Sequence, residues 1–276
     1  MQVAQWLGPR TSSLIARALG RVAYYIVPSR REIAKANLRA TIGRDWSEEE
    51  ISTVTRGVFS TIAQTLFEVA RFPRIGPTGT VRFVAPRDMS IFEQLGHLDT
   101  GAIWVSAHFG NWELLGSWAH AQGYPCDFLI GRQHNPLVDK LLNDMRASMG
   151  VGIIPVEDAL RGVLKSLRAG RNVAIAADQH AAAGSLVMDF LGRRASIARG
   201  PAIFAVKAGC PVVPVLMRRE RYDRHVVMVG DPIYPPDSGD RDEDVRIITR
   251  RWCDFMEESI RQYPMQWAWT HRRWKV

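Results

Sequence analysis

Short apolar runs alternate with helix-like segments over most of this chain, and that alternation constrains the fold more than any other feature. We expect strands at residues 81–85, 102–107, 126–130, 152–154, 172–176, 187–190, 212–217 and 225–229. Helices are expected between and after them, at residues 112–122, 136–149, 159–168, 201–208 and 242–262. The pattern predicts an α/β fold with a mostly parallel central sheet flanked by helices, and a ligand crevice at the carboxyl ends of the strands.

The first 72 residues follow a different pattern and are expected to be mostly helical. A short helix is expected at residues 32–41, and the run from Ser47 to Glu50 has the N-cap signature of a helix that continues toward Ala70. Residues 73–79 are rich in proline and glycine, which makes them the best candidate for an internal boundary. We therefore predict a single domain over 1–276, with an N-terminal helical segment (1–72) and an α/β core (73–276).

The chain is strongly basic, with 276 residues, a formal net charge of +8 and a sequence pI of about 9.8. Basic proteins favour polyanions, which here means nucleic acid, an anionic lipid surface or an acidic carrier. Nine tryptophans favour the lipid surface, because tryptophan and cationic side chains gather at the water–lipid boundary. A charge that only keeps the protein soluble remains an alternative.

The three cysteines are far apart in the sequence and odd in number. They match neither a metal-binding spacing nor a disulfide framework, so we expect no metal site and a reducing compartment.

Residues 11–28 form an amphipathic segment near the N-terminus. The apolar run is interrupted by Arg17, Gly20 and Arg21, so it does not reach the ~20 apolar residues of a membrane-spanning helix. No signal peptide is recognisable either. Such a stripe can face the protein core or lie on a membrane surface, and the sequence leaves both open.

His108 stands five residues before Glu113, across a break between an expected strand and an expected helix. Asn111 is a plausible N-cap for that helix, and a turn at residues 109–110 can fold the imidazole back toward the carboxylate. A carboxylate bonded to one ring nitrogen leaves the other free to take a proton, and the helix start offers backbone N–H groups to an oxyanion. The alternative is a structural histidine, which is common for a single match of this kind.

Three further side chains are candidates because they follow expected strands or lie on the next helix. Arg132 precedes the helix that carries Arg146, and either arginine can clamp a phosphate or carboxylate or simply be solvated. Asp178 follows the strand expected at 172–176, where it can orient a substrate group or cap a turn. Residues 193–199 are interpreted as a basic connector that can face a phosphorylated substrate.

The sequence lacks a G-x-G-x-x-G or P-loop phosphate motif and a G-x-S-x-G nucleophile elbow, which disfavours nucleotide enzymes and serine hydrolases.

Taken together, the segments described above resemble the lysophospholipid acyltransferase superfamily, and within it the bacterial lipid A late acyltransferases. The blocks that carry the resemblance occur in order: Ala36-Asn37-Leu38, His108 to Glu113, Asn135-Pro136 with Arg146, Asp178-Gln179 with residues 189–214, and the ending from Pro264 to Trp274.

The resemblance implies a role for each matched residue. His108 is expected to be the general base and Glu113 its orienting partner, with Arg146, Asp178, Arg132 and Asn111 supporting the site or binding substrate. The implied reaction moves a fatty acyl group from an acyl-carrier-protein or acyl-CoA thioester to a hydroxyl of a membrane glycolipid, most plainly in lipid A biosynthesis. No cofactor is expected beyond that co-substrate.

The implied setting is the cytoplasmic face of the bacterial inner membrane, with the protein peripheral or anchored through the membrane-facing segment 1–72. The expected partners are acyl carrier protein, an anionic membrane surface and the glycolipid acceptor, and nucleic acid is ranked last. Residues 195–199 lack the threonine-rich run common in the family, and the anchor segment is weaker than in many relatives.

Three alternatives to this interpretation stay open: an acyltransferase for phosphatidylinositol mannosides, a thioester hydrolase that uses the same residues on water, and a non-catalytic membrane or nucleic-acid binder. Acyl chain length, the acylated position and the oligomeric state do not follow from the sequence.

Overall fold

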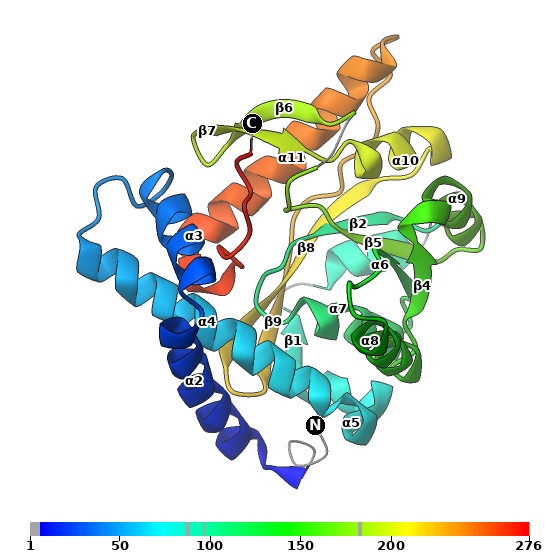
Figure 1. The fold of residues 1–276 in the computed structure, drawn as a ribbon. Helices are drawn as coiled ribbons and strands as arrows, with labels where there is room; N and C mark the ends of the chain where they lie inside the picture. The colour runs from blue at the N-terminus through cyan, green and yellow to red at the C-terminus, as the bar shows by residue number, and fades with distance from the viewer. Residues whose placement is uncertain (1–5, 87–88, 97, 182–183, 276) are drawn as a thin grey trace.

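A seven-stranded sheet lies at the centre of the structure, with helices on both faces (Figure 1). The computed structural model describes residues 6–86, 89–96, 98–181 and 184–275. The strands are β1 (Val84–Pro86), β2 (Ile103–Ser106), β3 (Cys126–Ile130), β4 (Gly152–Pro155), β5 (Asn172–Ala176), β8 (Val212–Arg221) and β9 (Arg224–Val229). They lie in the order β1–β9–β8–β2–β5–β3–β4, and every neighbouring pair is parallel except β8 with β9. The predicted α/β fold is therefore confirmed.

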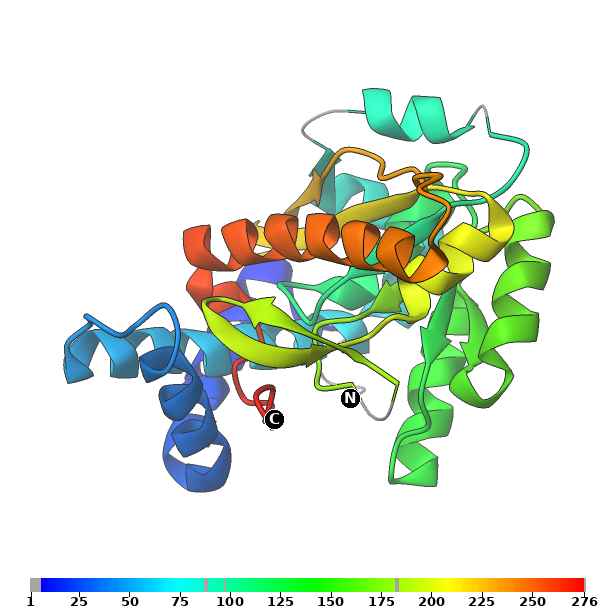
Figure 2. The ribbon, with the colours of Figure 1, turned by 90° about the horizontal axis from the view of Figure 1, so that it is seen from above.

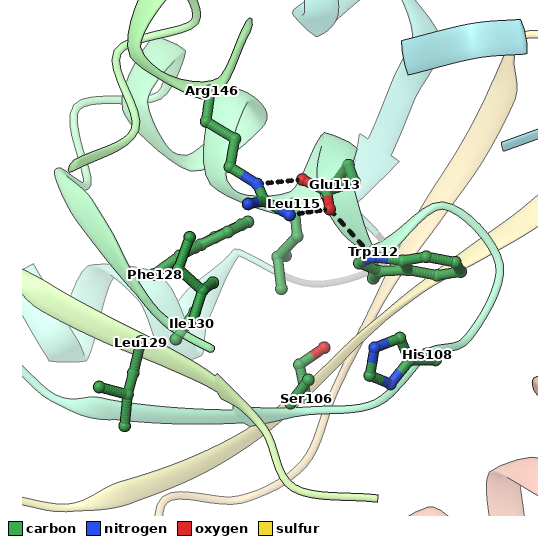
Figure 3. Close-up of a pocket in the computed structure, with 11 residues that line it drawn as sticks. Ser106, His108, Trp112, Glu113, Leu115, Phe128, Leu129, Ile130 and Arg146 are labelled. Atoms are coloured by element: carbon green, nitrogen blue, oxygen red, sulfur yellow. Dashed lines mark hydrogen bonds and ion pairs between the residues drawn. The ribbon is translucent and has the colours of Figure 1, made fainter. Parts of the chain in front are cut away.

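Each face of the sheet has its own apolar core. Neighbouring residues of a strand point to opposite faces, so Val105 packs in one core and Trp104 in the other. The first core contains α9 (Ala159–Arg168), α10 (Gly200–Ala208) and α11 (Arg241–Gln262), and Figure 2 shows α11 running across the molecule on that side. The second core contains α6 (Ser90–Gly96), α7 (Trp112–Ala121) and α8 (Pro136–Ser148). His108 leaves β2 on the second side, toward α7 (Figure 3).

The N-terminal part is helical, as predicted, and consists of α2 (Pro9–Ile26), α3 (Pro28–Arg39) and α4 (Glu48–Ala70). The predicted N-cap of α4 is a full capping box, in which Ser47 and Glu50 bond to each other's backbone N–H groups. α2 packs closely against α4 at Gly20, where an added Cβ would lie 2.6 Å from the Cα atom of Ser60. Within the described residues, no helix is both long enough and apolar enough to cross a membrane.

Two segments after the N-terminal helices differ in detail from their predictions. Residues 73–79 were expected to be without regular structure, but α5 (Phe72–Gly79) consists of two short helical pieces joined at Gly76, whose φ of 65° is not helical, so an interruption does fall inside this stretch. The strand expected at 81–85 is mostly a 3₁₀ turn, η1 (Thr80–Phe83), followed by the short β1. The other short turns of this kind are η2 (Val156–Asp158) and η3 (Pro264–Gln266).

A separate two-stranded hairpin lies outside the main sheet and consists of β6 (Leu186–Phe190) and β7 (Arg193–Ile197). β6 was predicted, but residues 193–197 were interpreted as a basic connector and are instead the second strand. The tight turn between the strands places both Leu191 and Gly192 at positive φ, 54° and 76°.

Candidate active site

The register of β2 against β5 brings together two candidate side chains from distant parts of the sequence. Ser106 pairs with Ala176 in parallel strands, and the next positions that follow the same register are His108 and Asp178. Both residues therefore leave neighbouring strands at the same edge of the sheet. This edge is the one where ligand crevices form in open parallel sheets.

Asp178 is the direct partner of His108. Its Oδ1 atom lies 2.8 Å from Nδ1 of the imidazole, and its Oδ2 atom accepts hydrogen bonds from the His108 backbone N–H at 3.1 Å and from Trp267 Nε1 at 2.8 Å. The Asp178 side chain is 3% exposed and that of His108 27%. The carboxylate is thus fixed from three directions, and the outer edge of the imidazole stays open to a ligand.

The pKa values of this pair shift in opposite directions. Burial opposes a charge on His108, but the negative charge and the hydrogen bond of Asp178 outweigh it, so the pKa of His108 lies above its ordinary value. Burial also opposes a charge on Asp178, and the charge and hydrogen bonds of His108 again outweigh it, so the pKa of Asp178 lies below its ordinary value. Asp178 therefore stays ionised, and His108 is a stronger base than a free imidazole.

Glu113 is held by Arg146. The guanidinium donates from Nε to Oε2 at 2.8 Å and from Nη2 to Oε1 at 2.5 Å, and the Trp112 indole donates to Oε1 at 3.2 Å (Figure 3). The Glu113 carboxylate was expected to orient His108 directly; in the structure Asp178 makes that hydrogen bond. Glu113 still lies near the imidazole, because the Trp112 ring that it holds is centred 5.1 Å from the His108 ring.

The loop between His108 and α7 is tied to the rest of the fold through its backbone. Its bonded N–H groups include those of Phe109 to Ala107, Gly110 to Gln266, Asn111 to Met217 and Leu114 to Asn111. These amides serve the fold, and of the four only that of Leu114 belongs to the first turn of α7.

Asn111 is the N-cap of α7, as predicted, and is fully buried. Its side-chain oxygen accepts from the Leu114 N–H, and its amide donates to Glu68 on α4 at 2.8 Å. Glu68 in turn pairs with Arg219 on β8. The role of Asn111 in this structure is therefore to hold the loop.

An apolar cavity opens beside His108 (Figure 3). It holds about 440 Å³ of empty space, its open mouth included. His108, Trp112, Glu113, Arg146 and the Ser106 hydroxyl lie at its polar side, and its apolar walls are Leu115, Phe128, Leu129, Ile130, Ala174 and Ala176. A cavity with apolar walls and a few convergent polar groups suits a fatty chain with one reactive carbonyl.

Ser106 is the polar group that this cavity leaves unsatisfied. The residue is 5% exposed, and its Oγ atom is buried without a hydrogen-bond partner in the described structure. In Figure 3 the hydroxyl points into the space between Leu115 and His108. Leaving a buried hydroxyl unpaired costs about 1–3 kcal/mol, a cost that a bound carbonyl oxygen would remove.

Arg132 is the predicted site residue that the structure does not bring to His108. Its side chain is 79% exposed at the end of β3 and pairs with Glu157 at 3.3 Å. It is not among the residues that line the cavity. Within the described residues there is also no group of three or more His, Cys, Asp or Glu side chains placed to hold a metal ion.

Three residues of the site were not singled out from the sequence. Trp267 fixes Asp178, and Gln179 Nε2 lies 3.3 Å from both ring nitrogens of His108. Asn37 donates to the backbone oxygens of Trp269 and His271 at 2.8 and 2.7 Å, which fastens the C-terminal segment to α3. All three lie in the blocks quoted for the family resemblance, which was the available signal.

Comparison with known proteins gives a family match over the whole chain. The family model of bacterial lipid A biosynthesis acyltransferases matches residues 1–276. The phosphatidylinositol mannoside acyltransferase of Mycolicibacterium smegmatis is 24% identical over 182 residues, which is 63% of this chain and 57% of that protein. The chain therefore matches less than two thirds of the length of this relative.

Two relatives match over more of their length. Lipid A biosynthesis acyltransferase 2 of Shigella flexneri is 24% identical over 253 residues, 86% of this chain and 76% of that protein. Lipid A biosynthesis myristoyltransferase of Escherichia coli is 24% identical over 268 residues, 95% of this chain and 80% of that protein.

Proposed function

Since this chain belongs to the bacterial lipid A biosynthesis acyltransferase family, we propose that it is an O-acyltransferase. It moves a fatty acyl group from an acyl-carrier-protein or acyl-CoA thioester to a hydroxyl of a membrane glycolipid. The observation that carries this proposal is that His108, held by the buried Asp178, lines an apolar cavity.

The reaction needs one base and no covalent enzyme intermediate. Asp178 holds Nδ1 of His108, so Nε2 takes the proton of the acceptor hydroxyl as its oxygen attacks the thioester carbonyl. The new C–O bond forms and the C–S bond breaks, and the proton on His108 passes to the departing sulfur. General-base catalysis of this kind contributes about 10²–10⁴-fold to the rate.

Glu113 and Arg146 act on His108 through Trp112. Their bidentate ion pair is almost fully buried, with 9% and 10% of the two side chains exposed, and it fixes the Trp112 indole against the imidazole. The pair thereby limits the positions that His108 can take. Glu113 is a positioning residue in this proposal.

Ser106 stabilises the negative charge that develops on the thioester carbonyl oxygen. Its hydroxyl is an unpaired donor on the wall of the cavity. An oxyanion is a stronger acceptor than the ground-state carbonyl, so the hydrogen bond strengthens as the reaction proceeds.

A basic, partly apolar surface supports a place at the membrane. α2 exposes Leu14, Leu19, Val22 and Ile26, each between 48% and 71% exposed, on a helix that also carries Arg10, Arg17 and Arg21. Such a helix can lie in the plane of an anionic leaflet. The proposed location is the cytoplasmic face of the inner membrane, peripheral or anchored near the N-terminus, and the net charge of +8 also suits an acidic carrier protein as donor.

The test of the proposal includes two acceptors, because relatives named for lipid A biosynthesis and relatives named for phosphatidylinositol mannosides are both 24% identical to this chain. The protein is incubated with acyl carrier protein that carries fatty acids of several chain lengths, and the lipids are then analysed by mass spectrometry. One reaction receives a lipid A precursor and a parallel reaction receives a phosphatidylinositol mannoside.

A mass gain of one acyl group on either acceptor identifies the reaction, the acceptor and the preferred chain length together. Free fatty acid without an acylated lipid would replace the proposal with a thioester hydrolase. No product from either acceptor, with membrane binding intact, would favour a non-catalytic binder.

A further inference from the structure

A second cavity, lined by a different set of residues, lies close to His108. It holds about 950 Å³ of empty space, its open mouth included. The start of α3, the loop after β5 and the C-terminal segment line it, through Ser29, Arg30, Ile33, Gln179, His180, His271, Arg272 and Lys275. These segments come from three distant parts of the sequence, and we call the cavity the basic pocket.

The basic pocket reaches the catalytic pair. Gln179 lines it and lies 3.3 Å from Nε2 of His108. His271 also lines it, and the centre of its ring is 6.3 Å from the centre of the His108 ring. A ligand in this pocket therefore places its neighbouring groups within reach of the imidazole.

The lining has one sign of charge. Arg30, Arg272 and Lys275 supply three cations, and none of the described lining residues is acidic. Among the ion pairs of the described residues, none involves these three side chains, whereas many of the other arginines, such as Arg250, pair with carboxylates. The pKa of His271 lies below its ordinary value because of burial and the charges of His108, Arg30 and Lys275.

We propose that the basic pocket binds a phosphate group on the headgroup of the acceptor lipid. This inference rests on the proposed acyl transfer, and it names the basic pocket as the binding site of the acceptor lipid. Arginine offers a planar pair of donors that matches phosphate, and unpaired cations on a concave wall have their charge available for it. Lipid A precursors and phosphatidylinositol mannosides both carry phosphate beside sugar or polyol hydroxyls, so the pocket fits either acceptor.

The two cavities then divide the substrates between them. The acyl chain enters the apolar cavity, the phosphorylated headgroup occupies the basic pocket, and His108 lies where the acceptor hydroxyl meets the thioester.

The kinetic test compares a phosphorylated lipid A precursor with the same lipid after phosphatase treatment, both in neutral detergent micelles. In the Arg272→Ala/Lys275→Ala variant, the ratio of kcat/KM for the phosphorylated over the dephosphorylated acceptor should fall at least tenfold. The single variant Arg272→Lys, which keeps the positive charge, should have a ratio between that of the wild-type protein and that of the double variant. The matched control is Arg161→Ala/Arg168→Ala, two exposed arginines on α9, which should keep the wild-type ratio. An unchanged ratio in the pocket variant overturns the inference.

A binding test separates this inference from the proposed activity. Phosphatidylcholine vesicles that contain the phosphorylated precursor should retain the wild-type protein and release the pocket variant, and the dephosphorylated lipid should not discriminate between them. This result would stand even if no acyl transfer were detected. If the variant instead loses only its binding to phosphatidylglycerol vesicles, the cations serve a general anionic surface and the inference is wrong.

Discussion

The Nδ1 atom of His108 lies 2.8 Å from Oδ1 of Asp178, a residue 70 positions further along the chain. The parallel register of β2 against β5 places the two residues side by side, and Trp267 from the C-terminal segment holds the carboxylate from behind. Three separate segments of the chain thus position one general base, His108.

Asp178→Asn should reduce kcat strongly and move the pH dependence. The free imidazole is the active form, so the wild-type rate falls as the pH drops through the raised pKa of His108. Without the charge of Asp178, burial is the largest remaining influence on that pKa and lowers it, so the acid limb of the kcat/KM profile should shift to lower pH. A pH–rate series on both proteins checks this. An acid limb that stays in place or moves upward in the variant would contradict the assignment.

Glu113→Ala should lower both the stability of the protein and its rate of acyl transfer. The change leaves Arg146 as a buried charge without its partner, which typically costs about 3–5 kcal/mol in the free energy of unfolding. Glu113→Ala/Arg146→Ala should recover part of that loss but not the activity, because Trp112 stays unheld. The matched control is Lys140→Ala, which breaks an exposed pair on the same helix as Arg146 and should change little.

Denaturant unfolding and initial rates measure these two effects separately. A rate loss below about threefold in Glu113→Ala would contradict its role in positioning His108.

Ser106→Ala should separate stability from catalysis. The variant loses a buried hydroxyl that has no partner, so its free energy of unfolding should stay equal or rise by about 1 kcal/mol. Its kcat should nevertheless fall, by up to about 10²–10³-fold if the hydroxyl meets the oxyanion. Ser117→Ala is the matched control, because Ser117 on α7 is also buried and unpaired but does not line the cavity. Equal rates in the two variants would exclude Ser106 from the reaction.

The sequence was sufficient to predict those helices and strands whose hydrophobic pattern and capping residues lie within the element itself. β3, β5 and α9 have the predicted bounds, and the capping box of α4 was recognised from four letters. β7 was missed because it begins with two arginines, which suggested a loop. It is a strand because it pairs with β6, a contact that its own residues do not indicate. β8 continues past its predicted end to Arg221, because Glu68 on α4 pairs with the buried Arg219 and makes a charged strand end stable inside the protein.

For the candidate site, the sequence indicated which residues to consider but not all of their contacts. His108, Glu113, Arg146 and Asp178 were all named as candidates from the sequence; the structure shows that the first three line one cavity and that Asp178 contacts His108. Which carboxylate contacts His108 was not predictable, because that depends on β5 lying next to β2 in the sheet. Sequence proximity favoured Glu113, five residues away, over Asp178, which strand order alone brings into contact.

The most direct test of the central claim is a single-turnover assay of acyl transfer to the acceptor lipid, with wild-type protein beside His108→Ala. We predict that the wild-type protein acylates the lipid, and that His108→Ala remains folded and binds vesicles but loses at least about 10²-fold in the transfer rate. Transfer by His108→Ala at the wild-type rate would contradict it, because the base would then be another group.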